Sequence, residues 1–214
     1  MRVVIAGGHG QVARLLESVL AERGDSSVGI VRNPDHVGDL ERAGAEAVML
    51  DLEQTDADAV ADVVRGADAV VFAAGGGPNS GPARKETVDK GAAILLADAA
   101  ERAGVRRYVM VSAMGTERAD PDSDDVFQVY LRAKKAADED LMARDLDWTV
   151  VRPGRLTDDP STGRVRVGTL PGGEVTRADV AAVLAEVLVT DSTIGKAFDV
   201  LAGDQAVDVA LAGL

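Results

Sequence analysis

The sequence predicts an α/β protein built on a doubly wound parallel sheet with helices on both faces. Three features of the 214-residue chain predict this class. Short apolar runs alternate with longer amphipathic stretches, most amphipathic stretches end at a glycine, and a glycine-rich turn follows the first apolar run. This alternation is typical of strands joined by crossover helices, which make the strands parallel within one sheet.

The expected strands are six short runs of almost wholly apolar residues. They are rich in β-branched side chains, as expected for strands that are buried on both faces. Because a helical pattern separates each run from the next, we expect a hydrophobic core on each side of the sheet. The runs span residues 3–6, 28–31, 47–50, 69–74, 108–111 and 148–151.

The expected helices begin and end at recognisable residues. In the first of them, apolar residues fall on one stripe over 12–23, and Gly24 follows as a helix stop. Asn33 caps the second helix, with Pro34 at its first position and Gly44 after its end. The remaining helical patterns cover 55–65, 84–103, 124–144 and 176–189.

We expect a single domain over 1–214, in which 153–195 forms a small substrate-side extension that caps the site. After Pro153 the alternation loosens, and Asp, Pro, Ser, Thr and Gly become frequent. We expect these later pieces to lie over the carboxyl ends of the strands, where open α/β sheets bind ligands. They are a short alternating run at 164–167, a last strand at 196–201 and a last helix at 204–211.

Charge and composition argue against several classes of function. The 23 basic and 36 acidic residues give a net charge of −13, which repels phosphate backbones and disfavours a nucleic-acid partner. With no Cys and two His, disulfides, thiolate nucleophiles and a metal centre are not expected. No apolar run is long enough for a membrane span or a signal-peptide core. We expect a cytoplasmic protein that acts on a small molecule as a monomer or homodimer.

The strongest local signal is the turn Gly-Gly-His-Gly-Gln-Val-Ala at residues 7–13. It lies between a buried strand and a helix, the context that a dinucleotide fingerprint requires. Without Cβ atoms the backbone can approach a diphosphate, and the free N–H groups at the helix start then face the anion. The small Ala13 lets helix and strand pack closely. The turn therefore predicts a Rossmann-type dinucleotide site; the alternative is a turn that binds nothing.

The residue after the second strand indicates which dinucleotide is bound. NAD-binding proteins of this fold usually carry Asp or Glu there, whereas this strand ends in Arg32. A guanidinium suits the 2′-phosphate of NADP through a bidentate, charge-assisted contact. We therefore predict NADPH in preference to NADH. Two alternatives stay open: Arg32 is a solvated surface residue, or nearby Asp35 neutralises part of its charge.

Two further strand ends complete the predicted cofactor surface. Asp51 and Leu52 follow the third strand and are placed to meet the adenine, although Asp51 would serve equally well as a loop cap. Ala73, Ala74 and Gly75 follow the fourth strand and are small where the dinucleotide would cross the sheet. A flexible connection without a binding role is the alternative for this second segment.

A candidate catalytic pair lies in the longest helical pattern. Tyr130 and Lys134 are four residues apart, so the phenol and the ammonium share a helix face. A positive charge about 4 Å from the phenol would lower its pKa by up to about 3 pH units before screening, which suits a proton donor to a carbonyl oxygen. Ser112, at the end of the fifth strand, is predicted to hold that oxygen. The alternative is a surface pair with Tyr130 packed on the core.

In this order along the chain, these residues resemble the atypical short-chain dehydrogenases/reductases, in the NmrA-like and biliverdin-reductase-B-like (flavin reductase) branch. The resemblance covers nearly the whole chain and includes Arg152-Pro153-Gly154. It implies catalysis by Tyr130, Lys134 and Ser112, with Lys134 on the nicotinamide ribose. It also implies NADP contacts from Gly7, His9, Gly10, Gln11, Val12, Arg32, Asp51, Leu52, Ala73, Ala74, Gly75, Lys134, Pro153 and Gly154.

The sequence departs from the wider family in one respect. Other members use an Asn in their proton relay, and residues 84–103 contain no Asn that could take this place. His9 is expected to contribute its backbone rather than its imidazole, and His36 to be solvated on a helix. Arg152 and Arg155 either face an anionic ligand or offset nearby acidic side chains.

The sequence therefore predicts an NADPH-dependent oxidoreductase that transfers a hydride to a small carbonyl, quinone or flavin-like acceptor. The alternative is a non-catalytic NADP(H)-binding protein with a redox-sensing or regulatory role, because 158–173 carries no obvious acid or base. A sugar-nucleotide epimerase is the third interpretation, but it needs a larger substrate lobe than the residues after Pro153 are expected to supply.

Overall fold

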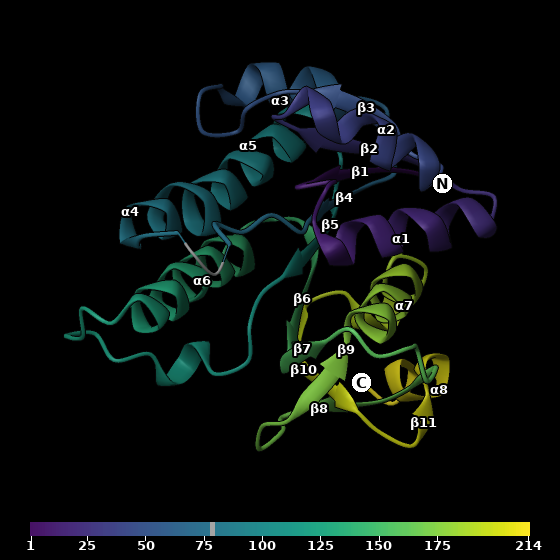
Figure 1. Cartoon of the computed structure of the whole chain (residues 1–214), viewed down its shortest axis with the longest axis vertical. Helices are drawn as coiled ribbons and strands as arrows, with labels where there is room; N and C mark the ends of the chain where they lie inside the picture. The colour runs from purple at the N-terminus through teal and green to yellow at the C-terminus, as the bar shows by residue number, and fades with distance from the viewer. Residues whose placement is uncertain (78–79) are drawn as a thin grey trace.

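The computed structural model describes residues 1–77 and 80–214. Its strands are β1 (Arg2–Ala6), β2 (Ser26–Val31), β3 (Glu46–Met49), β4 (Ala69–Phe72), β5 (Arg107–Val111), β6 (Asp147–Pro153), β7 (Arg155–Thr157), β8 (Arg164–Gly168), β9 (Glu174–Thr176), β10 (Lys196–Ala202) and β11 (Gln205–Ala206). Within the described residues, the main sheet has the order β11-β8-β10-β6-β5-β4-β1-β2-β3 (Figure 1). All neighbouring strands from β10 to β3 pair in parallel, whereas β8 is antiparallel to both of its neighbours. The predicted doubly wound α/β class is confirmed.

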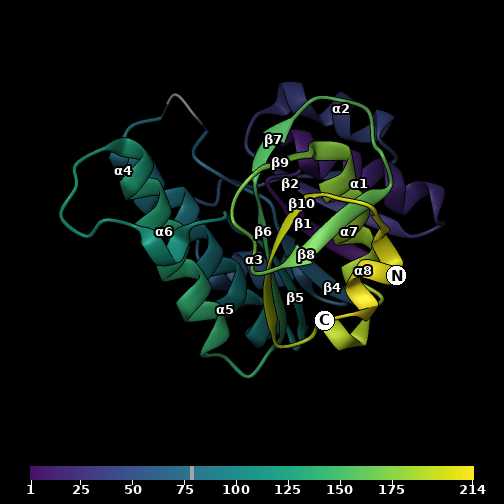
Figure 2. The same cartoon turned by 90° about the horizontal axis from the view of Figure 1, so that it is seen from below.

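Helices cover both faces of this sheet (Figure 1 and Figure 2). One face carries α1 (Gln11–Glu22), α7 (Arg177–Val187) and α8 (Val207–Ala212). The other face carries α3 (Ala57–Val64), α5 (Ala93–Ala103) and α6 (Val126–Met142). The shorter elements are η1 (Pro34–His36), α2 (Val37–Arg42), α4 (Pro82–Arg84), η2 (Lys85–Ala92), η3 (Thr116–Arg118) and η4 (Asp191–Thr193). Among the described helices, none combines the length and the apolar character needed to cross a lipid bilayer.

The core is divided into two layers by the sheet. Along β1, Val3 and Ile5 pack with Leu16 of α1, whereas Val4 packs on the opposite side with Leu96 of α5. Successive side chains of a strand point to opposite faces, and here both faces are covered by helices. This is why the strand sequences are continuously apolar rather than alternating.

The expected helix over 84–103 is built from three pieces. It starts two residues earlier as α4, continues as the π-helical stretch η2, and ends as α5 before Gly104. π-Helical turns are rare and are frequent at functional sites. The fourth strand is also shorter than predicted: it ends at Phe72, which leaves the next residues as a loop.

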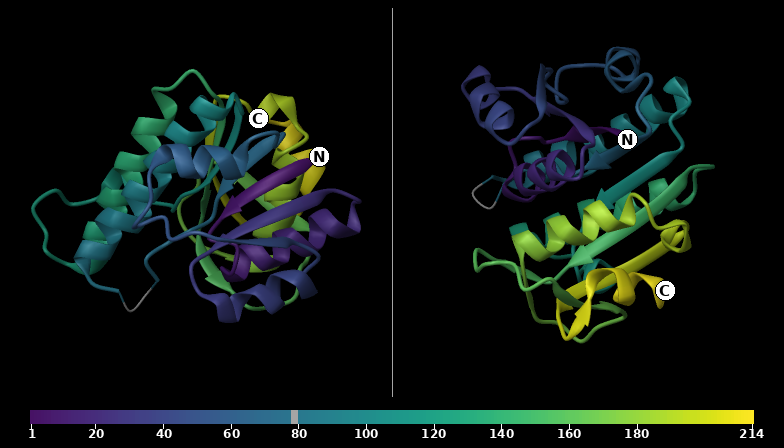
Figure 3. Two further views of the ribbon diagram at one scale, coloured as in Figure 1. Left: turned by 90° about the horizontal axis from the view of Figure 1, so that it is seen from above. Right: turned by 90° about the vertical axis from the view of Figure 1, so that its right-hand side faces the viewer.

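The segment 153–195 contributes to the main sheet, to one face of it and to a small separate sheet, and its role as a substrate-side cap stays a prediction. β8 extends the main sheet beside β10, and α7 packs against α1 on one face of the sheet (Figure 3). Only β7 and β9, which form a small separate sheet, continue directly past the carboxyl end of β6. The short alternating run predicted at 164–167 forms β8, and the apolar side of this strand joins the core that α7 covers.

The carboxyl ends of three strands are level with one another. Ala6, the last residue of β1, is paired in register with Ile30 of β2 and with Phe72 of β4. The order of the sheet reverses between β1 and β4, because the chain first adds strands on one side of β1 and then on the other. A crevice is expected outside the carboxyl ends at such a point.

One carboxyl group lies inside the core beneath the glycine turn. Glu17 of α1 is fully buried, and neither of its oxygens has a hydrogen-bond partner among the described residues. Its side chain fills space beside two glycines: a Cβ on Gly29 would lie 2.7 Å from Oε1, and one on Gly8 would lie 3.0 Å away. Burial raises the pKa of Glu17 to about 8, opposed in part by Arg14. Glu17 is therefore neutral at pH 7.

We predict that Glu17→Gln removes a pH dependence of stability. The folded carboxyl keeps its proton up to about pH 8, whereas the unfolded one releases it near pH 4.5. The stability that Glu17 contributes is thus fully present below pH 4.5, is lost as the pH rises through this window, and levels off above it. The slope is at most about 1.4 kcal/mol per pH unit.

Urea unfolding between pH 5 and pH 9 measures this effect. The free energy of unfolding of wild type should fall relative to E17Q as the pH rises, and the exposed Glu22→Gln on the same helix serves as the control. Wild-type and E17Q profiles that run parallel would contradict a buried neutral acid at this position.

Candidate functional site

Two cavities meet at the carboxyl ends of β1 and β4. The smaller has a volume of about 300 Å³ and the larger about 690 Å³, and both are bordered by Gly10 and by the loop after β4. The predicted residues on the smaller cavity are Gly7, His9, Gly10, Arg32, Asp51, Leu52, Ala73, Ala74 and Gly75. Those on the larger are Gly10, Gln11, Val12, Ala73, Ala74, Gly75, Ser112, Tyr130, Lys134 and Pro153. Gly154 borders an adjoining groove that shares Ser112 and Tyr130 with the larger cavity. The fold thus brings all the predicted site residues to one crevice.

The glycine turn is held close to the loop after β4. Gly7 has a φ of +83°, and a Cβ at this position would lie 2.6 Å from the Cα of Ala74. The N–H of Gly10 donates to the Gly7 carbonyl at 2.8 Å, which closes the turn. α1 then starts with no side-chain cap and no acidic residue in its first turn. Its first N–H groups therefore remain available to an anion.

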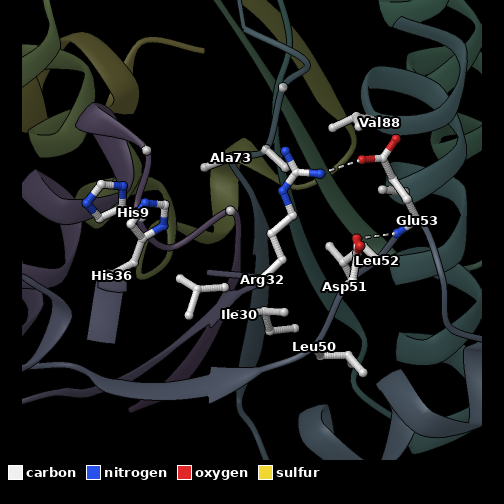
Figure 4. Close-up of a pocket in the computed structure, with 16 residues that line it drawn as sticks. His9, Ile30, Arg32, His36, Leu50, Asp51, Leu52, Glu53, Ala73 and Val88 are labelled. Carbon is white, nitrogen blue, oxygen red and sulfur yellow. Dashed lines mark hydrogen bonds and ion pairs between the residues drawn. The ribbon is translucent and has the colours of Figure 1, made fainter. Parts of the chain in front are cut away.

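Two imidazoles line the smaller cavity, which the sequence did not predict for His36. The rings of His9 and His36 are stacked with centroids 3.5 Å apart, and His9 Nε2 lies 2.7 Å from Asp39 Oδ2. Figure 4 shows this stack on one side of the cavity and Glu53 on the other, with Arg32 between them. His36 is thus part of the pocket wall rather than a solvated helix residue.

Arg32 is paired with Glu53, not with Asp35 as the sequence suggested. Its side chain is 50% exposed and its Nη1 donates to Glu53 Oε2 at 3.0 Å. The same carboxylate accepts from Arg84 at 3.0 Å and from the hydroxyl of Thr87 at 2.6 Å. These contacts, led by the Thr87 hydrogen bond, lower the pKa of Glu53. Both guanidinium groups thus share the Glu53 carboxylate, and half of the Arg32 side chain remains exposed at the rim.

Asp51 has the loop-capping contact that was left open as an alternative. Its Oδ1 accepts a hydrogen bond from the N–H of Glu53 at 3.0 Å, and the residue also borders the smaller cavity. Asp51 therefore shapes the turn that presents Glu53 to Arg32.

The predicted catalytic residues lie together on the larger cavity. Lys134 is buried, and its Nζ donates to the Val111 carbonyl at 2.9 Å and lies 3.8 Å from Asp89 Oδ1. The Ser112 hydroxyl is also buried and has no hydrogen-bond partner in the described part of the chain. Tyr130 is half-buried, with the Nζ of Lys85 5.4 Å from its ring centroid. A bound polar group would satisfy the free Ser112 hydroxyl.

The expected lowering of the Tyr130 pKa is wrong. Burial raises the pKa of Tyr130 well above its usual value, and the carboxylates of Asp89 and Asp138 raise it further. The expectation took Lys134 as the only nearby charge, whereas two acids from different positions offset it. Tyr130 is therefore a neutral phenol at all ordinary pH values.

Three charged residues at the site were missed by the sequence reading: Lys85, Asp89 and Asp138. All three are buried. Each acid follows a lysine by four residues on a helix, so the pairs 85/89 and 134/138 share helix faces. Opposite charges at this spacing usually mark a solvated surface, and only their burial here distinguishes these pairs from surface pairs.

The arginines around Pro153 have protein partners rather than a free anion site. Arg152 Nε donates to Asp138 Oδ2 at 3.0 Å, and Asp138 is fully buried. Arg155 pairs with Glu174 at the surface. Burial raises the pKa of Asp138, and this is opposed by Arg152 and by the nearby Ser112 hydroxyl, which approaches the carboxylate without a hydrogen bond of regular geometry. Arg152 thus neutralises a buried carboxylate, whereas Arg155 neutralises one at the surface.

Known proteins resemble this chain along its whole length. A family model described as NAD(P)H-binding matches residues 7–191. The uncharacterised sugar epimerase YhfK of Bacillus subtilis (strain 168) is 35% identical over 99% of both chains. A solved structure from Bacillus halodurans, provisionally assigned as an NAD-dependent epimerase/dehydratase, is 38% identical over 100% of both chains with a TM-score of 0.93. The oxidoreductase ylbE of Lactococcus lactis is 28% identical over 100% of this chain and 96% of its own, with a TM-score of 0.89.

We predict that Arg152→Met destabilises the protein by leaving Asp138 buried without its partner. The free energy of unfolding should fall by about 3 kcal/mol, and most of this loss should be recovered in Arg152→Met/Asp138→Asn. Arg155→Met is the matched control and should change stability by less than about 1 kcal/mol. Chemical denaturation measures all four proteins. Equal losses for the two single arginine variants would contradict a special role for the buried pair.

Proposed function

The chain belongs to the NAD(P)H-binding family of atypical short-chain dehydrogenases/reductases, and from this premise we propose that it is an NADPH-dependent reductase of small carbonyl, quinone or flavin-like acceptors. The observation that carries the proposal is the pair of cavities joined at the glycine turn. One cavity carries Arg32 and the other carries Tyr130, Lys134 and Ser112. A dinucleotide has the same two-part form, with a diphosphate between its halves.

The residues at the junction fit such a group. The uncapped start of α1 supplies N–H donors for the diphosphate, and Gly7 and Gly10 remove side chains from its path. At the smaller cavity, the half-exposed guanidinium of Arg32 is the group that would pair with a 2′-phosphate. These features support NADPH over NADH in our proposal.

On the other side of the junction, the side chains support reduction. When bound, the nicotinamide supplies the hydride. Ser112 has a free hydroxyl to hold an acceptor oxygen, and Lys134 has donors left for a ribose hydroxyl. Because burial keeps Tyr130 protonated, its phenol can donate to that oxygen, and the alkoxide formed by hydride addition is basic enough to take the proton. The raised pKa of Tyr130 favours reduction over the reverse reaction.

The outer wall of the larger cavity supports an apolar acceptor. Val126, Phe127 and Leu156 line it, and the Phe127 side chain is 59% exposed although it is large and aromatic. The Phe127 ring lies 6.0 Å from the Tyr130 ring, in a tilted arrangement. Aromatic surfaces of this kind suit planar ligands such as quinones and flavins.

Sugar-nucleotide epimerisation is a second candidate because two of the similar proteins carry epimerase names. The two activities differ in their use of the cofactor. A reductase consumes NADPH when an acceptor is added, whereas an epimerase interconverts sugar nucleotides without net consumption of the dinucleotide. Assays of aldehydes, quinones, flavins and sugar nucleotides distinguish them. Tight binding of NADP(H) without turnover of any of these substrates would instead favour a redox-sensing protein.

We predict that NADPH raises the melting temperature more than NADH at equal concentration, because only NADPH carries the 2′-phosphate that Arg32 would contact. Arg32→Ala should weaken NADPH binding about tenfold and NADH binding about twofold at most. Arg32→Asp should reverse the preference. Arg65→Ala, at an exposed arginine directly after the end of α3, is the control. Equal thermal shifts for both dinucleotides would remove the NADPH preference.

We also predict that Tyr130→Phe slows carbonyl reduction by about 100-fold or more, because it removes the proton donor. The affinity for NADPH should stay within about twofold, and reduction of flavins or quinones should persist where no proton from Tyr130 is needed. Steady-state kinetics with NADPH binding measured in parallel test this. Unchanged turnover of carbonyl substrates would exclude Tyr130 as the acid.

A further inference from the structure

A cluster of charged side chains is buried beside the larger cavity. Lys85, Asp89, Lys134 and Asp138 are each at most 5% exposed. Charges are expensive to bury unless they are paired, so such a cluster needs an account. The proposed function uses Lys134 alone and gives no role to Asp89.

Asp89 joins three separate elements through one carboxylate. It is carried by the π-helical stretch η2, and its Oδ2 accepts a hydrogen bond from the N–H of Gly76 at 3.0 Å. Its Oδ1 lies 3.8 Å from Lys134 Nζ on α6 and has no hydrogen-bond partner in residues 1–77 and 80–214. The carboxylate packs so closely on the loop after β4 that a Cβ on Gly75 would lie 3.1 Å from Oδ1.

The surroundings of Lys134 identify Asp89 as its counter-ion. The ammonium is held by the Val111 carbonyl on one side and lies over the Phe72 ring at 5.2 Å on another. The charged groups that face it are Asp89 and Lys85 from η2 and Asp138 from α6 itself. Asp138 already pairs with Arg152 of β6 at 3.0 Å. Asp89 is therefore the buried acid whose charge is left for Lys134.

These contacts also bear on the protonation of Lys134. Burial lowers the pKa of Lys134, and the carboxylates of Asp89 and Asp138 oppose that effect. Removal of the Asp89 charge would let burial lower this pKa further. A neutral amine would still fit the space, but it would lose the charge with which it holds a ligand hydroxyl.

We infer that Asp89 is a positioning residue for the cofactor, which keeps the Lys134 ammonium charged and fixed at the cavity wall. This inference rests on the proposed function, because Lys134 is given its ligand there. Asp89 acts through Lys134 and through the Gly76 loop that borders both cavities. The competing role is purely structural, in which Asp89 only anchors that loop.

Asp89→Asn separates the two roles. The amide of Asn keeps an oxygen that can accept from the Gly76 N–H, so the loop anchor survives while the negative charge is lost. The matched control is Glu86→Gln, which removes an exposed acid from the same helix. The readout is the dissociation constant of NADPH between pH 6 and pH 9.5, with the melting temperature of the nucleotide-free protein measured alongside.

As the pH rises, both proteins should lose affinity for NADPH. In D89N this loss should begin at a pH at least about one unit lower than in wild type. At pH 6, the end of the range that most favours the ammonium, the two dissociation constants should agree within about threefold. On the alkaline side D89N should bind NADPH about tenfold more weakly. E86Q should follow wild type throughout. Two outcomes would overturn the inference. In one, the NADPH affinities of D89N and wild type coincide at every pH; in the other, D89N binds NADPH more weakly than wild type by the same factor at every pH.

A second pair of proteins tests the coupling even where D89N alone folds poorly. Lys134→Met and Lys134→Met/Asp89→Asn should bind NADPH equally weakly, because Asp89 has no ammonium left to position. A further loss in the double variant would overturn the inference. Failure of wild type to bind NADPH at any pH would overturn the proposed function and this inference together, whereas the other negative outcomes leave the proposed function standing.

Discussion

The approach of the backbone at Gly7 to the backbone at Ala74 is the constraint on which the ligand crevice depends. At 2.6 Å from the Ala74 Cα, no Cβ can stand at residue 7, so the turn after β1 and the loop after β4 close on each other only with glycine there. Ala74 borders both cavities, and Gly7 borders the smaller one. The parallel pairing of β2, β1, β4 and β5 then brings Arg32 and Ser112 to the same edge from distant parts of the sequence.

Burial decides the chemistry of the titratable groups around this crevice. Removal from water raises the pKa of Glu17 and of Tyr130, so that both keep their protons. The same effect lowers the pKa of Lys134 and so disfavours its charged form. Arg152 and Asp138 offset the cost of burial by pairing with each other, whereas Glu17 has no hydrogen-bond partner in the described part of the chain and remains neutral. The wall between η2 and α6 therefore holds paired charges, while the buried carboxyl beneath the glycine turn is uncharged.

Much of the fold follows from local patterns. Continuous apolar runs predicted six of the strands of the parallel sheet, because helices on both faces make both sides of each strand apolar. The patterns did not predict where β8 would pair, nor the π-helical turn in η2, since neither depends on periodicity alone. At the site, the residues of the glycine turn and the pair Tyr130/Lys134 were found by spacing. The direction of the Tyr130 pKa shift was not predicted, because it follows first from burial and then from Asp89 of another helix and Asp138.

The sequence by itself determined which residues make turns, which faces of helices are apolar, and which chemical groups are available at each strand end. These properties depend on neighbours within a few positions, which the chain carries wherever it folds. Only the tertiary structure decided that Glu53 rather than Asp35 meets Arg32, and that Asp89 and Asp138 surround Lys134. The reason is physical: electrostatic interactions and desolvation depend on distance in space and on depth below the surface, and neither quantity is encoded in the order of residues along the chain.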